Sequence, residues 1–287
     1  RLPPCPTPCH DRSRVAALSL DPAQGPPADG RPPGCEWVKF VPPGEQAPPE
    51  FVGVLPRISG QQVCVVPLPR ATLAAWKTAA SLEAAPPEGA FLSTDDVVTA
   101  RVWQALCAMR CTQLGLPADS ELPTAVYRAC NVRTRADPPL GPGYFGNGAT
   151  QVRTGLTVRR LLASPVSEVA RQLRAALLAF DAPAISALAH WQHRQQELGC
   201  ATTLAFDPHA LTFIVSSWRC DWEGVDFGAK PFAFEHGALT PVVTVFTPRP
   251  QDDGLNVWHS GSPEALNQFE SLLHTATSTA GHSSGDN

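Results

Sequence analysis

The residues best suited to chemistry lie in 214–231 (IVSSWRCDWEGVDFGAKP), where a strand-like segment ends in Ser216-Ser217-Trp218. A serine hydroxyl and an indole N–H are both competent hydrogen-bond donors. The Asp226-Phe227-Gly228 that follows also occurs in protein kinases, but the sequence has no glycine-rich loop, V-A-I-K lysine or H-R-D loop upstream of it. The absence of these kinase motifs argues against a protein kinase.

The eight histidines are the candidates for a general base. Only His282 is followed four residues later by an aspartate, Asp286, but it lies in the polar tail. A general base must be held within about 3 Å of the proton that it removes, which a disordered tail cannot do. Three other histidines are expected on a solvated helix face, in an exposed linker and in a structural role: His193 (paired with Glu197), His10 and His236.

Three further motifs precede residues 214–231. Residues 8–13 (PCHDRS) match P-x-x-D-R-S, and residues 92–103 (LSTDDVVTARVW) contain S-x-x-D-x-x-x-A-x-x-W. Residues 131–147 contain N-x-R-x-R, then P-P-L, then G-Y-F-G-N. In this order, and together with S-S-W and D-F-G-A-K-P, they resemble the BAHD family of acyl-CoA-dependent acyltransferases, in particular its hydroxycinnamoyltransferase-like members.

The resemblance implies the second half of a two-domain enzyme, each domain being similar to chloramphenicol acetyltransferase. In such enzymes the catalytic H-x-x-x-D closes the first half, before the D-R-S segment. The chain begins at Arg1, and its single methionine is Met109. We therefore expect the first domain and its histidine to be absent from this chain, and the chain alone to be inactive.

The resemblance also implies the reaction and the residues that serve it. A histidine deprotonates an alcohol or amine acceptor, the acceptor attacks the thioester of acyl-CoA, and a tetrahedral oxyanion forms. Ser216 and Trp218 are expected at the reaction channel as oxyanion donors, with serine in place of the more frequent threonine. Ser93 and Thr94 match positions that approach CoA, although helix capping explains them equally well. Acyl-CoA is expected as a co-substrate, with no bound cofactor and no metal.

The remaining motif residues are expected to be structural. The resemblance pairs Asp226 with an arginine away from the catalytic centre, Arg133 being the first candidate and Arg135 the second. The segment D-F-G-A-K-P is one residue shorter than the family's D-F-G-W-G-K-P, which puts the shape of this turn in doubt. Gly228 is expected to serve the turn itself. A tight turn is expected at 144–147, with Tyr144, Gly146 and Asn147 as its structural residues.

The acceptor is less well specified. Members that act on shikimate-type acceptors carry an arginine at the position of Thr203, and residues 199–214 contain no Arg or Lys. This weakens a carboxylate-bearing acceptor. Two alternatives to the enzyme remain open: a non-catalytic truncated relative that acts as a binding protein, and a condensation-type domain of a peptide synthetase.

Composition supports a loop-rich globular protein. Of 287 residues, 43% are hydrophobic, and 22 basic against 26 acidic residues give a net charge of −4. That balance argues against nucleic-acid or membrane-surface binding. No apolar run approaches the roughly 18 residues of a membrane-spanning helix. Nine cysteines do not form a disulfide framework, which favours a reducing, cytoplasmic setting. We expect a monomer.

Helix and strand patterns alternate along the chain, which predicts the α/β class: an α+β mixed sheet with flanking helices. Helices are expected at 69–81, 94–114 and 262–273, and in a region from 165 that breaks or restarts at 181–183. Strands are expected at 36–41, 62–67, 124–131, 151–158, 212–217, 231–235, 242–247 and 256–259. Residues 1–50 are expected to be a crossover loop or linker, 51–275 the acyltransferase domain, and 276–287 a disordered tail.

Overall fold

The structure is a computed structural model. It describes residues 61–83, 91–141, 143–204, 211–219 and 243–278, with short pieces at 9, 11, 13–14, 18, 38–41, 44, 228–229 and 232–233. The described residues belong to two compact units. The first draws on Arg1–Pro56, Ala129–Arg153 and Ala175–Pro208, and the second on Arg57–Arg128, Thr154–Arg174 and His209–Asn287.

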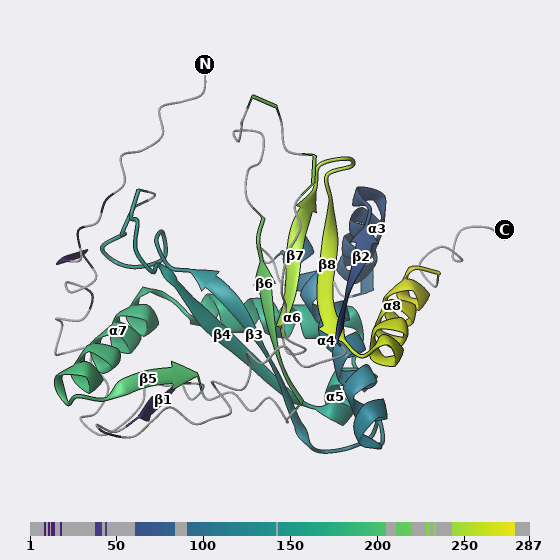
Figure 1. Ribbon diagram of the computed structural model, residues 1–287, viewed down its shortest axis with the longest axis horizontal. Helices are drawn as coiled ribbons and strands as arrows, with labels where there is room; N and C mark the ends of the chain where they lie inside the picture. The colour runs from purple at the N-terminus through teal and green to yellow at the C-terminus, as the bar shows by residue number, and fades with distance from the viewer. Residues whose placement is uncertain are drawn as a thin grey trace. The chain divides into compact units, whose positions relative to one another are not determined.

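Six strands form one sheet with the spatial order β2-β8-β7-β6-β3-β4 (Figure 1), and of these β2, β6, β7 and β8 belong wholly to the second unit. Strands β3, β6 and β7 run parallel, whereas β7–β8 and β2–β8 are antiparallel pairs. The mixed sheet expected from the sequence is therefore confirmed. The strands are β2 (Gln62–Leu68), β3 (Pro123–Asn131), β4 (Ala149–Thr157), β6 (Leu211–Ser217), β7 (Val243–Arg249) and β8 (Gly254–Gly261).

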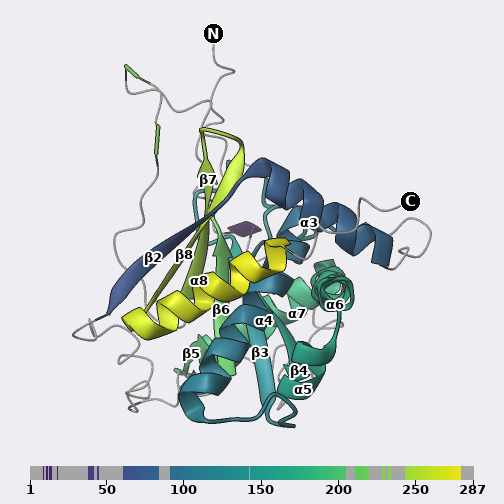
Figure 2. The ribbon, with the colours of Figure 1, turned by 90° about the vertical axis from the view of Figure 1, so that its right-hand side faces the viewer.

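Three helices cover one face of this sheet: α3 (Arg70–Glu83), α4 (Thr94–Leu114) and α8 (Pro263–Ser278) (Figure 2). Helix α4 lies between the other two and contacts β6. It is buried on most of its surface, and Trp103 is fully enclosed, with its indole Nε1–H donating to Thr124 Oγ1 at 3.1 Å. Twelve of the 21 residues of α4 are buried, which places this helix in the core. Helices α5 (Val158–Ala163) and α6 (Val166–Ala179) follow β4 in sequence.

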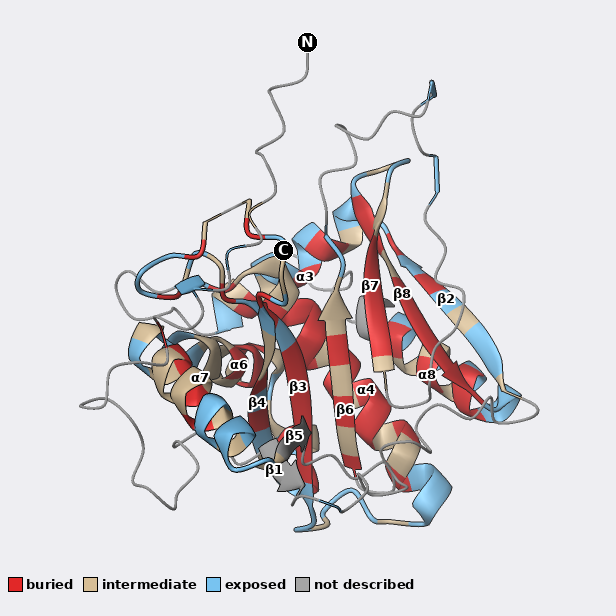
Figure 3. Ribbon diagram, turned by 60° about the vertical axis from the view of Figure 1, so that its left-hand side comes forward, coloured by how far each residue is buried: buried red, intermediate tan, exposed pale blue. Residues whose placement is uncertain are grey.

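Burial distinguishes the middle of the sheet from its edge. Strands β7 and β8 are buried along most of their length, whereas β2 at the edge exposes Val63 and Val65 and buries Val66 and Leu68 (Figure 3). Alternation of this kind is expected where only one face of a strand meets the helices. The fully buried aromatic side chains of the core are Trp76, Trp103, Phe246 and Phe269.

The first unit contains a two-stranded antiparallel sheet and one long helix. Strand β1 (Val38–Val41) pairs with β5 (Ala201–Leu204), and helix α7 (Ala182–Glu197) contacts β5. Asp181 caps α7, because its Oδ1 accepts from the backbone N–H of Ala184 at 3.0 Å. The helical region that the sequence left undecided at 181–183 therefore ends with α6 and restarts as α7.

Most predicted elements are present with shifted ends, and two were missed. Helix α5 has six residues and β5 has four, too few for a clear period in the sequence. The strand predicted at 231–235 and the tail at 276–287 lie largely outside the described residues. Within the described part of the chain, no helix is long and apolar enough to cross a membrane. The described cysteines, including the buried Cys107 and Cys111, form no disulfide bonds.

His259 is the buried titratable group of the β8–α8 layer. Its side chain is enclosed, its Nδ1 lies 3.0 Å from Thr244 Oγ1, and its ring lies 5.1 Å from that of Phe269. Burial lowers the pKa of His259 to about 4, and a hydrogen bond with the backbone of Val243 opposes this shift only in part. The fold therefore holds this imidazole neutral.

We predict acid sensitivity from this group. Because its pKa is lower in the folded chain than in the unfolded chain, protonation favours unfolding. Its contribution to stability is complete above about pH 6.5 and is lost as the pH falls towards 4, by about 3 kcal/mol in total. His259→Gln should flatten this part of the curve of unfolding free energy against pH, measured by urea denaturation. The exposed His193→Gln is the matched control, and equal slopes in both variants would contradict the assignment.

Candidate active site

The donors predicted at the end of β6 lie together. Trp218 continues the pairing with β7, because its backbone N–H donates to Phe246 O at 2.8 Å. Its indole Nε1–H donates to Ser216 Oγ at 3.0 Å. Residues two apart on an extended strand face the same side, which lets the two side chains meet. Ser216 is half-buried and the Trp218 side chain is 43% exposed, so this pair is open to a ligand.

Ser93 and Thr94 have different roles at the N-terminus of α4: Ser93 caps the helix, and Thr94 lines a pocket. Ser93 Oγ accepts from the backbone N–H of Asp96 at 3.2 Å, and Asp96 Oδ2 accepts from the Ser93 backbone N–H at 2.9 Å. This reciprocal pair is a capping box. The Ser93 hydroxyl also donates to Asp96 Oδ2 at 2.7 Å, so it is fully used by the helix. Thr94 instead lines a pocket.

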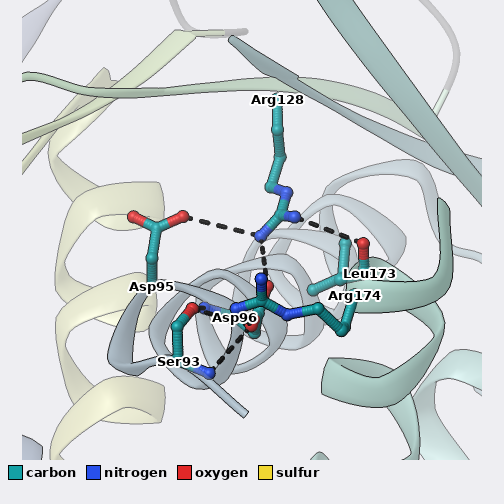
Figure 4. A network of polar contacts seen from close by, with 6 residues as sticks. All are labelled: Ser93, Asp95, Asp96, Arg128, Leu173 and Arg174. Atoms are coloured by element: carbon teal, nitrogen blue, oxygen red, sulfur yellow. Dashed lines mark hydrogen bonds and ion pairs between the residues drawn. The ribbon is translucent and has the colours of Figure 1, made fainter. Parts of the chain in front are cut away.

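A buried ion cluster anchors this cap (Figure 4). Asp96, which has no exposed surface, receives Arg128 Nη1 on Oδ1 at 2.8 Å and Arg174 Nη2 on Oδ2. Arg128 also donates to Leu173 O at 3.2 Å, and lies 3.5 Å from Asp95 Oδ2. Burial alone would raise the pKa of Asp96, but the hydrogen bonds from Ser93 and Arg128 outweigh it and hold that pKa below its usual value. The carboxylate therefore stays charged.

The pocket next to Thr94 is basic. It has a volume of about 390 Å³, and it lies within the second unit, against α3, the start of α4 and the β7–β8 turn. Its ionic residues are three cations and one acid: Arg70, Lys77, Arg219 and Asp253. Arg70 Nη1 lies 3.0 Å from Asp253 Oδ2, which leaves a net positive charge. Arg219 directly follows Trp218, so the pocket adjoins the donor pair along the chain.

These cations were missed by the sequence interpretation. Arg70, Lys77 and Arg219 are scattered over 150 positions and belong to no motif. Only the fold brings them to one pocket. Arg128 and Arg174 were missed for the same reason. The sequence suggested Asp96 as an acid at the start of a helix, but no nearby residue pattern indicated its two arginine partners, which are 32 and 78 residues away.

In the first unit, Arg133 holds the loop 144–148. Its guanidinium donates to the carbonyls of Tyr144 at 3.0 Å, Gly146 at 2.8 Å and Gly148 at 3.4 Å. A Cβ at Gly146 would lie 2.4 Å from Tyr144 Oη, so a larger residue does not fit there. Tyr144 is buried, and Asn147 Oδ1 accepts from the Ala149 backbone at 3.3 Å.

The expected partner of Asp226 stays a prediction, because Asp226 lies outside the described residues. The bonds of Arg133 go to the loop carbonyls above, and Arg135 Nη2 donates to Leu177 O at 2.5 Å and Phe180 O at 2.9 Å. Both arginines therefore organise backbone within their own unit. Gly228 has a φ of +88°, a turn conformation that side chains rarely adopt.

Of the four histidines weighed above as a general base, only His193 lies in the described part of the chain, and it is not at this site. His193 Nε2 lies 3.5 Å from Glu197 Oε1, and both are exposed. His10, His236 and His282 lie outside the described residues. No group of three or more His, Cys, Asp or Glu side chains that could hold a metal ion occurs in the described part of the chain.

A family model described as Transferase family matches residues 71–275. Putrescine hydroxycinnamoyltransferase 1 of Oryza sativa subsp. japonica is 28% identical over 200 residues, covering 65% of this chain and 44% of that protein. Shikimate O-hydroxycinnamoyltransferase of Nicotiana tabacum is 26% identical over 186 residues, covering 63% of this chain and 41% of that protein. The chain thus spans under half the length of these relatives.

Solved structures agree on the fold. TRI101 of F. sporotrichioides, in complex with coenzyme A and T-2, superposes with a TM-score of 0.63 at 22% identity, covering 79% of this chain and 52% of that one. Vinorine synthase superposes with a TM-score of 0.57 at 17% identity, covering 76% and 48%. The similarity therefore covers about three quarters of this chain and supports the same fold.

We predict that the Asp96 cluster dominates the stability of the second unit. Asp96→Asn removes the charge that two arginines share, and should lower the free energy of unfolding by about 3–5 kcal/mol. Asp95→Asn is the matched control, because the contact of Asp95 with Arg128 Nη1 is 3.5 Å long and its side chain is 31% exposed. The control should cost less than about 1 kcal/mol. Urea denaturation of both variants tests this, and similar midpoints would contradict it.

Proposed function

The chain belongs to the Transferase family, that of the BAHD acyltransferases, and from this premise we propose that it supplies the CoA-binding and oxyanion-stabilising part of an acyltransferase. The acyl group moves from acyl-CoA to an alcohol or amine. The observation that carries this proposal is the basic pocket that adjoins the donor pair of Ser216 and Trp218.

The pocket suits the charged end of CoA. Coenzyme A carries a diphosphate and a 3′-phosphate, and Arg and Lys are the side chains that bind phosphate best in proteins. Arg70 and Lys77 of α3 and Arg219, which follows β6, line one volume of about 390 Å³, within the usual range for small-molecule sites. Thr94 adds a hydroxyl at its wall. Ser93 instead maintains the helix end that presents Thr94.

The end of β6 suits the reacting carbonyl. Attack on a thioester places negative charge on the carbonyl oxygen, and a preorganised donor is typically worth about 3 kcal/mol there. Ser216 lies in β6, which pairs with β7 at this residue and with β3 as far as Val215, and Trp218 directly follows the strand with its backbone bonded to Phe246 O, so the pair is anchored to the sheet. The pantetheine arm of CoA would link the pocket to this pair.

The general base is proposed to come from the remaining part of the full-length enzyme, as the histidine of an H-x-x-x-D motif. The relatives are more than twice as long as the matched stretch of this chain. Three of the four described histidines are also poorly suited to the role. His259 is enclosed beneath α8, and His193 and His274 lie on exposed helix surfaces next to Glu197 and Glu270.

The acceptor is proposed as an alcohol or an amine. The names of similar proteins include putrescine and tryptamine, which are amines, and shikimate, which is an alcohol. In this chain no Arg or Lys occurs in 199–214, where a shikimate-type acceptor would need a cation. An acceptor without a carboxylate therefore fits the sequence better.

The test of the function is acyl-CoA turnover, followed by release of free thiol with a panel of alcohols and amines. We expect turnover only when residues 1–287 are joined to the rest of the enzyme. Turnover by residues 1–287 alone would contradict the origin of the base. No thiol release in either form would contradict the proposed function.

We predict that removing a cation from the pocket weakens CoA binding and that removing its acid strengthens it. Arg219→Gln removes a cation that would donate hydrogen bonds to a phosphate of CoA. This should weaken the binding of CoA about tenfold, measured by calorimetry at low salt. Asp253→Asn removes the pocket's acid and frees Arg70, so it should tighten binding about twofold to fivefold. Asp253 has a φ of +53°, which asparagine also adopts.

The controls for these variants separate charge from folding. Arg159→Gln, which removes an exposed cation paired with Glu121 outside this pocket, should leave CoA affinity unchanged. Binding of pantetheine, which lacks the phosphates, should be equal in all variants. Unchanged CoA affinity in both Arg219→Gln and Asp253→Asn would exclude this pocket as the phosphate site.

A further inference from the structure

We propose that Trp218 acts through Ser216 and that the pair presents one oxyanion donor, the Ser216 hydroxyl. This rests on the proposed acyltransferase function. The sequence suggested that both side chains donate to the oxyanion. The geometry differs, because the indole Nε1–H points at Ser216 Oγ, 3.0 Å away.

The count of donors carries the inference. An indole has a single N–H and accepts no hydrogen bond, so its only donor is already used by Ser216. A serine hydroxyl has one O–H and two lone pairs. When the indole occupies a lone pair, the Ser216 O–H is left to donate elsewhere. Trp218 is therefore a positioning residue, and Ser216 is the group that touches the reacting oxygen.

The surrounding sheet maintains this arrangement. The backbone N–H of Trp218 donates to Phe246 O at 2.8 Å, and Ser216 pairs with Val245 on β7. Phe246 has no exposed surface, so β7 is fixed at this point by the core. The indole cannot approach a ligand with its N–H without breaking the bond to Ser216. Chained hydrogen bonds polarise one another, which strengthens the Ser216 donor by about 10–30%.

The proposed reaction transfers the acyl group through a tetrahedral intermediate. The acceptor oxygen or nitrogen forms a bond to the thioester carbonyl carbon while the general base takes its proton. The C=O π electrons move to the oxygen, and the resulting oxyanion accepts the hydrogen bond of Ser216. The oxyanion then collapses, the C–S bond breaks, and the CoA sulfur leaves as a thiolate that takes the proton from the base. Ser216 and Trp218 are unchanged at the end.

A double-mutant cycle tests the relay in the enzyme that turns over acyl-CoA. Ser216→Ala should lower kcat about 100-fold. Trp218→Phe, which keeps the ring and loses the N–H, should lower kcat about twofold to tenfold. In the Ser216→Ala background, Trp218→Phe should have no further effect, because its target is gone. The KM for acyl-CoA should stay within about twofold throughout, and Ser216→Thr should restore kcat.

Two outcomes of this cycle would contradict the relay from Trp218 to Ser216. If Trp218→Phe lowers kcat by the same factor in both backgrounds, the indole donates independently and the relay is wrong. A rise in the KM for acyl-CoA with unchanged kcat would also overturn it, because that pattern marks a binding role.

A second readout does not depend on turnover. The indole N–H resonance of Trp218 can be assigned among the seven tryptophans as the signal that Trp218→Phe removes from a ¹⁵N spectrum of this chain. Ser216→Ala should shift this proton upfield, and the neighbouring Ser217→Ala should not. An unmoved resonance in Ser216→Ala would overturn the relay. A shifted resonance in an enzyme that turns over no acceptor would refute the proposed function, and with it any catalytic role of the pair.

Discussion

The second unit depends on one buried carboxylate. Asp96 is enclosed at the start of α4 and is shared by Arg128 of β3 and Arg174 of α6, so that three elements meet at one charge. A buried ion is costly unless its partners are well placed, and here the cap of Ser93 and two guanidinium groups satisfy it. The guanidinium of Arg174 also lies 4.7 Å from the Phe91 ring. The cluster thereby sets where α4 begins.

The position of that helix start matters because the candidate site lies beside it. Thr94, the first residue of α4, faces the pocket whose cations come from α3 and from the residue after Trp218. Strands β3, β6 and β7 are parallel, so their carboxyl ends lie at one edge of the sheet. Ligands of α/β sheets bind beyond such ends. Pocket and donor pair therefore follow from the direction of the strands.

Different parts of the fold carry the donor pair and the cations of the proposed site. In the proposed site the end of β6 holds the Ser216 donor, where pairing with β7 keeps the hydroxyl oriented before the reaction. The pocket uses long, exposed cations, which suit a mobile phosphate-bearing ligand. The loop held by Arg133 lies in the first unit and serves its own backbone. The family's length and the positions of the described histidines favour a base supplied by the rest of the enzyme.

The sequence by itself determined what depends on near neighbours. The cap at Ser93, the helix 94–114 and the strand before Trp218 follow from residues a few positions apart, and the four motifs identified the family. Only the tertiary structure decided the partners of Asp96, which are 32 and 78 residues away, and the pocket cations, which belong to no motif. It also decided that the indole of Trp218 bonds to Ser216. Long-range contacts depend on how strands and helices pack, and no local pattern records that packing.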